Sequence, residues 1–274
     1  MNAEDETDCE RVIILAAGQG TRLRPYTDDR PKCLVEIGGR SLLDRQLDVL
    51  EATGLRDVIV VAGYRADLIP RDRIAVVRNT RYADTNMVWT LFCAQEHFTA
   101  PLIVAYGDIV YDYDVLKALR DSPADIAVVS DNNWRAYWET RNDDPLSDVE
   151  TFVTAEGRIT ALGGRPETLD EVEGQFIGLM RFTETGVQQV LEAFRTMHAQ
   201  DSEGSSRAHT AFMTDLLQEA IDLGFRVDAV ETNGSWVELD TVQDLMSPIT
   251  KRRLQAVAQS VQRVASPGPC WELD

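Results

Sequence analysis

The chain lacks long hydrophobic runs, paired cysteines and histidine clusters, and each absence excludes a class of protein. No apolar stretch reaches the roughly 18 residues that cross a bilayer, so we expect no membrane segment. Residues 1–10 are acidic and lack the apolar core of a secretory signal, which makes the cytoplasm the expected compartment. The four cysteines form no C-x-x-C pair, and the three histidines show no metal-ligand spacing. A disulfide framework and a structural zinc site are therefore not expected.

Positive charge is also scarce. The chain has 27 Lys and Arg against 46 Asp and Glu, a net charge of −19. Because a nucleic-acid partner needs a basic surface, none is expected. A small anion can still bind where cations gather locally, since exposed charges farther away are screened within about 10 Å. Arg22, Arg24, Arg30 and Lys32 form such a local group.

Apolar segments of strand length alternate with segments of helical periodicity, which predicts an α/β fold. We expect a three-layer, Rossmann-like, mostly parallel sheet with helices on both faces and a small β-rich insertion facing the substrate. Residues 11–265 are expected to form one domain, between an acidic flexible N-terminus at 1–10 and a loose tail at 266–274.

The expected strands are 11–16, 57–62, 74–77, 102–106, 126–130, 149–154, 158–162, 175–182, 227–230 and 236–239. The expected helices are 41–53, 87–97, 112–120, 184–197, 212–223 and a terminal helix from 241. Ser41, Asp112 and Thr241 are predicted helix caps, with Asp244 as the capping-box partner of Thr241. Residues 132–145, rich in Trp, Arg, Asn and Asp, are expected to be exposed or to face a substrate.

A glycine turn follows the first strand, in the run L-A-A-G-Q-G-T-R-L-R-P from Leu15 to Pro25, and Pro31-Lys32 follows closely. Backbone N–H groups in such a turn, together with nearby cations, match the charge of a polyphosphate. A dinucleotide-binding G-x-G-x-x-G would need glycine where Leu23 stands, and the spacing of a P-loop is absent. The turn therefore predicts a nucleoside triphosphate site of another kind.

The pattern L-A-A-G-x-G-T-R-L-x-P…P-K-x-L resembles the signature of nucleotidyltransferases, which join a nucleoside monophosphate to a phosphorylated small molecule. The resemblance implies that the nucleotide is bound by Leu15, Ala16, Ala17, Gly18, Gly20, Thr21 and Arg22. Lys32 and Arg22 are the catalytic candidates, because nucleotidyl transfer builds negative charge that fixed cations stabilise. The resemblance also maps Asp108 and Asp240 onto the two acidic residues that hold Mg²⁺, the one expected cofactor, so all four should meet in one cleft.

Later segments resemble the phosphocholine and phosphonate cytidylyltransferases, notably N-x-x-Y-x-x-T-N at 79–86, D-V-E at 148–150 and W-V-E-L-D at 236–240. The implied partners are CTP and a small phosphonate or phosphate monoester, with phosphonate preferred. Asn86 and Thr90 are then candidates for reading cytosine. Glu238, Trp134, Tyr137 and Arg165 are candidates for binding the acceptor, although the aromatics could equally be core packing.

Other functions stay open at this point. Sugar-1-phosphate nucleotidyltransferases usually carry Glu-Lys-Pro where this chain has Gly164-Arg165-Pro166. A glycosyltransferase would share the metal-binding Asp but does not need the glycine turn, and a regulator without catalysis would not need Lys32. The sequence leaves open which acceptor is used, whether the protein is a monomer or a homodimer, and whether residues 200–207 close over the site.

Overall fold

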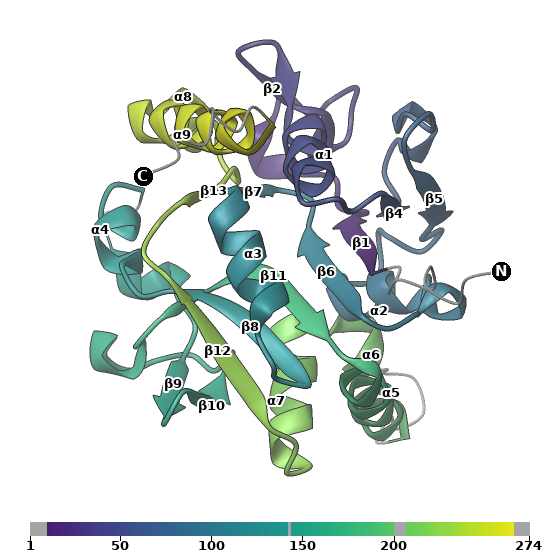
Figure 1. Ribbon diagram of the computed structural model, residues 1–274, viewed down its shortest axis with the longest axis vertical. Coiled ribbons are helices and arrows are strands. Elements are labelled where there is room, and N and C mark those ends of the chain that lie inside the picture. Colours follow the sequence, from purple (N-terminus) through teal and green to yellow (C-terminus); the bar gives the residue numbers. More distant parts are fainter. Residues whose placement is uncertain (1–9, 142–143, 200–206, 266–274) are drawn as a thin grey trace, which may run out of the picture.

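The computed structural model describes residues 10–141, 144–199 and 207–265 (Figure 1). Our sequence interpretations of residues 1–9, 200–206 and 266–274 lie outside these ranges. Glu10, which we had grouped with the flexible N-terminus, is instead buried. Its carboxylate accepts hydrogen bonds from Arg120 and Arg181 at 2.6 and 2.8 Å.

A nine-stranded sheet forms the centre of the molecule, in the order β5-β4-β1-β6-β11-β8-β12-β10-β9. The strands are β1 (Arg11–Ala16), β4 (Asp57–Ala62), β5 (Ala75–Arg78), β6 (Leu102–Tyr106), β8 (Ile126–Asp131), β9 (Phe152–Ala155), β10 (Arg158–Leu162), β11 (Gln175–Phe182) and β12 (Val227–Thr232). β1 pairs in parallel with β4 and β6, and β8 with β12. β11 lies antiparallel between β6 and β8, so the sheet is mixed but mostly parallel, as the sequence predicted.

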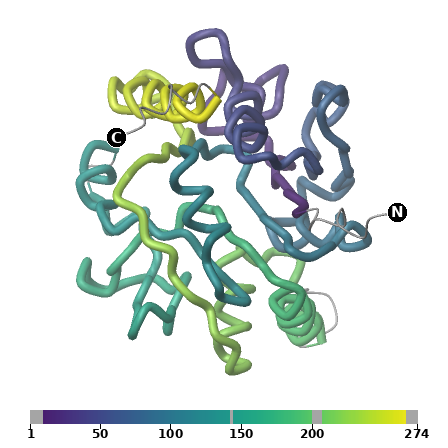
Figure 2. The backbone as a smooth tube through the Cα atoms, viewed as in Figure 1, coloured from purple at the N-terminus to yellow at the C-terminus, as the bar shows by residue number. Residues whose placement is uncertain are grey.

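Helices cover both faces of this sheet, because the central strands are apolar on both sides. Val12 and Ile14 of β1 belong to the core under one helical layer, whereas Ile13 and Leu15 belong to the core under the other. The first layer contains α1 (Leu42–Ala52), α3 (Tyr113–Asp121) and α9 (Pro248–Ala265), and the second α2 (Met87–Phe92), α5 (Glu184–Ala199) and α7 (Met213–Asp222). Figure 2 shows the same arrangement as a continuous trace.

Short elements complete the fold. Three further helices are α4 (Trp134–Trp138), α6 (Arg207–Thr210) and α8 (Val242–Met246). Two small ribbons pair β2 (Glu36–Ile37) with β3 (Arg40–Ser41), and β7 (Ile109–Tyr111) with β13 (Trp236–Glu238). The predicted caps form: the side chains of Ser41, Asp112 and Thr241 accept N–H groups in the first turns of α1, α3 and α8.

Several sequence expectations differ from the structure, and the terminal helix expected from 241 is divided into α8 and α9. The helix expected over 87–97 ends at Phe92 and is followed by a 3₁₀ turn at Gln95–His97. Strand β7 was not expected, because three residues beside a Gly-Asp turn carry too little pattern. The expected hairpin β9–β10 forms, and it extends the edge of the central sheet through β12.

No helix within the described residues is long and apolar enough to span a lipid bilayer.

The order of the strands places a binding edge beside β1. The chain passes from β1 to β4 and β5 on one side, while β6 lies on the other. Where strand order reverses in this way, the loops at the carboxyl ends diverge and leave a crevice for ligands. The glycine turn after β1 and the Gly107-Asp108 turn after β6 both lie at this edge.

Candidate active site

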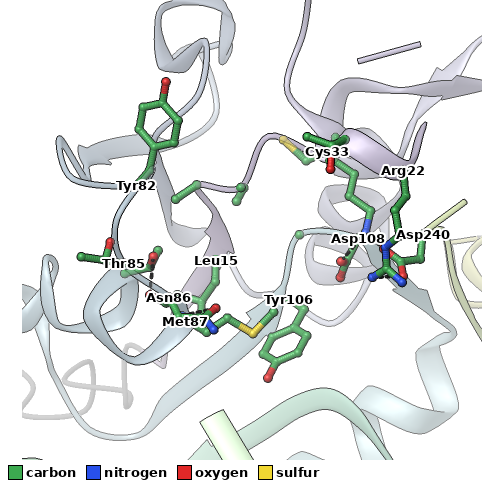
Figure 3. Close-up of a pocket in the computed structure, with 18 residues that line it drawn as sticks. Leu15, Arg22, Cys33, Tyr82, Thr85, Asn86, Met87, Tyr106, Asp108 and Asp240 are labelled. Atoms are coloured by element: carbon green, nitrogen blue, oxygen red, sulfur yellow. Dashed lines mark hydrogen bonds and ion pairs between the residues drawn. The ribbon is translucent and has the colours of Figure 1, made fainter. Parts of the chain in front are cut away.

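A cavity of about 300 Å³ opens at the carboxyl ends of β1 and β6 (Figure 3). Its two ends differ in chemistry. At one end lie Tyr82, Thr85 and Asn86, and at the other Arg22, Asp108 and Asp240. Seven lining residues come from positions 15–22, and all seven are among the nucleotide-binding residues expected from the sequence. They are Leu15, Ala16, Ala17, Gly18, Gly20, Thr21 and Arg22.

The glycine turn holds its shape through Gly20, whose φ of 66° lies in the left-handed region. A Cβ at this position would lie 3.0 Å from the Cβ of Lys32, so only glycine lets the lysine approach the turn. Thr27 stabilises the turn, because its hydroxyl donates a hydrogen bond to the Gly20 carbonyl at 2.8 Å. At Gly18, by contrast, a Cβ would meet no atom within 4 Å, so the backbone there faces open space.

Lys32 joins the two carboxylates that the sequence analysis placed in one cleft. Its Nζ lies 2.7 Å from Asp108 Oδ2 and 2.7 Å from Asp240 Oδ1. Arg22 forms an ion pair with the other oxygen of Asp240. Burial by itself lowers the pKa of Lys32, but the nearby carboxylates of Asp108, Asp240 and Glu238 outweigh it and raise the pKa above its ordinary value. The lysine is therefore a permanent cation at neutral pH.

Asp108 and Asp240 are also the residues that suit a metal. Oδ1 of Asp108 is buried and has no hydrogen-bond partner, and hard carboxylate oxygens are the ligands that Mg²⁺ prefers. Among the described residues, no group of three or more His, Cys, Asp or Glu could hold a metal unaided. The donor set thus fits an ion that shares its coordination with phosphate oxygens and water, as Mg²⁺ commonly does.

The far end of the cavity is polar and tightly hydrogen-bonded. Thr90 is buried, and both Thr90 and Asn86 line the cavity as expected for base-reading residues. The Asn86 side chain, however, is already engaged: its oxygen accepts the N–H of Met87 at the start of α2, and its nitrogen donates to the carbonyl of Thr210. Its role in base recognition stays a prediction.

Tyr106 forms part of the cavity wall next to Asp108, and carboxylates gather around it. Burial, and then the negative charges of Glu150, Asp108, Glu238 and Asp215, raise the pKa of its hydroxyl. Glu150 is itself affected: burial raises its pKa to about 7, despite a hydrogen bond from Thr214. This side of the site is therefore rich in negative charge.

The aromatic candidates for acceptor binding do not line the cavity. Trp134 and Tyr137 are 4% and 3% exposed and belong to the hydrophobic core. The indole of Trp134 donates to the carbonyl of Val172, and the Tyr137 ring lies under the Arg253 guanidinium at 3.8 Å. Residues 134–138, which we expected to be exposed or to face a substrate, are thus mainly packing residues. Arg165 is exposed and also lies outside the cavity lining.

Glu238 lies between the cavity and this packed region. Arg141 donates to its carboxylate at 2.6 Å and to Asp244 at 2.8 Å, and the guanidinium lies 4.8 Å from the Trp138 ring centre. Burial raises the pKa of Glu238, and the neighbouring carboxylates add to the rise, while Arg141 opposes it. Asp244 serves twice, since it also closes the capping box with Thr241.

Several cavity residues were missed from the sequence. Tyr82 and Thr85 stood within the N-x-x-Y-x-x-T-N run but received no role, although their motif positions could have suggested one. Tyr106 is the last residue of the apolar strand β6, directly before Gly107-Asp108. Nothing in the strand's sequence indicates that its last side chain lines the cavity. Met87, Cys33 and Gly107 also line the cavity.

Known proteins resemble this chain in sequence and in fold. A model of the MobA-like NTP transferase domain matches residues 12–204. The chain is 34% identical over 251 residues to CTP:phosphoglutamine cytidylyltransferase of Campylobacter jejuni, covering 88% of this chain and 99% of that one. It is 35% identical over 98 residues to choline-phosphate cytidylyltransferase of Streptococcus pneumoniae, covering 34% and 43%. The solved inositol-1-phosphate CTP transferase from T. maritima shares the fold, with a TM-score of 0.70, 20% identity and coverage of 95% and 98%.

Proposed function

The chain belongs to the MobA-like NTP transferase family, and we propose that it is a cytidylyltransferase that transfers CMP from CTP to a small phosphonate or phosphate monoester, with release of pyrophosphate. The relative that it matches over most of both chains is named for the same nucleotide and a phosphorylated acceptor. CTP and phosphorylated metabolites are cytoplasmic compounds, so the cytoplasm is the proposed compartment.

One observation carries the proposal: a half-buried, permanently charged lysine lies 2.7 Å from two carboxylates beside an open glycine turn. A triphosphate bound along this turn would bring its phosphates to Lys32 and Arg22. The cations would stabilise the charge that develops at the α-phosphate and on the departing pyrophosphate. A magnesium ion held by Asp108 and Asp240 would add positive charge to the triphosphate.

The lining residues favour direct attack by the acceptor. The cavity lining contains one thiol, that of Cys33, and burial raises its pKa to about 12. A protonated thiol that is 1% exposed is a poor nucleophile. We therefore propose that an oxygen of the acceptor attacks the α-phosphorus in line, without a covalent enzyme intermediate.

The charges near Tyr106 indicate the class of acceptor. Glu150, Asp215 and Glu238 lie outside the cavity lining but close enough to raise the pKa of Tyr106, and we propose that these carboxyl groups favour an acceptor whose far end carries an ammonium group. The aromatic cage expected for a quaternary ammonium is not supported, because Trp134 and Tyr137 are core residues. A carboxylated acceptor is also disfavoured, since Arg141 is already paired with carboxylates. We propose an aminoalkyl phosphonate or phosphate.

Pyrophosphate release tests the proposal directly. Purified protein with Mg²⁺ is incubated with CTP, UTP, dTTP or ATP, each with an aminoalkyl phosphonate, phosphocholine, a carboxylated phosphonate or a hexose-1-phosphate. CTP with the aminoalkyl phosphonate should give the largest signal. UTP or dTTP with a hexose phosphate giving the largest signal would instead show a sugar-1-phosphate nucleotidyltransferase. Nucleotide binding without pyrophosphate release from any pair would point to a regulator.

Two substitutions test the site itself. Asp108→Asn and Asp240→Asn should each reduce turnover about 10²–10³-fold, because each removes one charged ligand from the reacting centre. Asp121→Asn, at an exposed ion pair with Lys117, is the matched control and should keep full activity. Near-normal turnover in both site variants would show that the metal is held elsewhere.

A further inference from the structure

A buried amide lies behind the polar end of the cavity. Asn79, which directly follows β5, is 1% exposed. Its Nδ2 donates to Thr85 Oγ1 at 3.0 Å and to Thr90 Oγ1 at 3.0 Å, which uses both of its hydrogens. Both threonines line the cavity. Asn79 therefore connects two hydroxyl groups at the end of the site opposite to Lys32.

The orientation of this amide is determined by the backbone. Its Oδ1 accepts the N–H of Arg81 at 2.9 Å, and a backbone N–H can only donate. A flipped amide would place its NH₂ group against that N–H and leave two donors facing each other. Nδ2 is thus fixed toward the threonines, and each hydroxyl oxygen must accept one hydrogen bond from it.

The hydroxyl hydrogens are also committed. Thr85 donates to the carbonyl of Arg81 at 2.8 Å, and Thr90 donates to the carbonyl of Asn86, one turn back in α2, at 3.0 Å. A hydroxyl has one hydrogen and two lone pairs. With the hydrogen and one lone pair used, each threonine has a single lone pair left. Toward the cavity, both groups are acceptors only.

We propose that Asn79 acts as a positioning residue that makes Thr85 and Thr90 acceptor-only groups, and that these two hydroxyls select the amino group of cytosine over the carbonyl of uracil. This inference rests on the proposed function, in which CTP is the donor. The exocyclic amine of cytosine donates hydrogen bonds, whereas O4 of uracil accepts them. Uracil would bring lone pairs against lone pairs, or would require a threonine to break its bond to a backbone carbonyl.

The inference assigns base selection to Thr85 as well as Thr90, and gives Asn79 a reason to be polar in a buried position. Leucine or valine at this position would fill the space but would donate to neither hydroxyl oxygen, so one lone pair of each would be left without its fixed donor. The selection acts through unpaired polar groups, which discriminate more strongly than shape does between two bases of nearly equal size.

Binding measurements test this without knowledge of the acceptor. Isothermal titration in Mg²⁺ buffer compares CTP, UTP and pyrimidin-2-one riboside triphosphate, which has only hydrogen at position 4. In the unmodified protein, CTP should bind at least about 30-fold more tightly than UTP, with the unsubstituted analogue between them. An analogue that binds no better than UTP would overturn the acceptor-only assignment.

Substitutions then locate the effect. Thr85→Val and Thr90→Val keep the shape and remove an acceptor, so each should lower the ratio of CTP to UTP affinity about tenfold, mainly by weakening CTP. Thr90→Ser restores the hydroxyl and should restore most of the ratio. Thr53→Val is the matched control, because Thr53 also donates to a carbonyl in its own helix but lies outside the cavity lining.

The outcomes separate the two proposals. A protein that prefers CTP, with the same ratio in the valine variants, would overturn base selection by the threonines and leave the cytidylyltransferase proposal standing. A purely structural role would also leave the ratio unchanged, since both affinities would fall together. Preference of the unmodified protein for UTP would overturn the proposed donor itself, and base selection for cytosine with it.

Discussion

Replacing Lys32 with methionine tests whether charge holds the site together. The nearest oxygens of Asp108 and Asp240 each lie 2.7 Å from Nζ, so they are no more than about 5.4 Å apart. At that separation and an effective dielectric of about 20, two negative charges repel by about 3 kcal/mol. Lys32→Met should lower the free energy of unfolding by about this amount, and the melting temperature by about 6–12 °C in metal-free buffer.

Mg²⁺ should recover much of this loss, since a divalent cation can take the place of the missing ammonium group between the carboxylates. Calorimetric melting with and without Mg²⁺ measures both effects. Turnover should stay about 10²–10³-fold low even with Mg²⁺, because the ion does not replace the cation at the α-phosphate. Lys117→Met, at the exposed pair with Asp121, is the matched control and should melt like the unmodified protein. Unchanged melting of Lys32→Met in metal-free buffer would refute the reasoning.

Three further predictions follow from the packing and charge around the site. Gly20→Ala and Gly39→Ala both place alanine in left-handed backbone, so the two variants should lose similar stability. Only the new Cβ at position 20 presses on Lys32, so only Gly20→Ala should reduce turnover. Equal activity of the two variants would contradict this. The pKa of Glu150 in the folded protein, about 7, exceeds its value in the unfolded chain, so the stability that its protonated form provides is lost as pH rises through 7. Glutamine stays neutral at every pH. The Glu150→Gln variant should therefore melt at a higher temperature than the unmodified protein at pH 8.5, and at a similar temperature at pH 5. Trp134→Leu should lower the melting temperature with little change in the acceptor KM, and a large rise in that KM would place Trp134 in the acceptor site after all.

The layers of the fold could be predicted from the sequence because the core strands carry strong local patterns. Residues 58–62 and Leu102–Tyr106 are continuous apolar runs, and Asp112 is followed by the periodicity of a helix. The order of the elements along the sequence does not reveal that one strand inserts antiparallel into the middle of the sheet. Nothing in Gln175–Phe182 distinguishes a strand that enters between β6 and β8 from one added at an edge.

The charged end of the cavity could also be predicted from the sequence, because its residues follow strands or lie in a dense motif. Lys32, Asp108 and Asp240 meet as expected. The burial of the aromatic segment could not be predicted from the sequence, since Trp134 and Tyr137 stand among charged residues that are typical of a surface. Burial of such a segment depends on partners that are remote in sequence, and Arg253, on the last helix of the described residues, is one of them.

The contact between Lys32 and Asp240 joins residues that are 208 positions apart, and the second of them follows a strand that pairs only with β7. A chain still being synthesised therefore contains the glycine turn, Lys32 and Asp108 long before it contains Asp240. Fragments that stop ahead of Trp236, whether from interrupted translation or from proteolysis, would lack a complete centre. Such fragments would have Lys32 and Asp108 without Asp240, so the lysine could pair with one carboxylate but not with both.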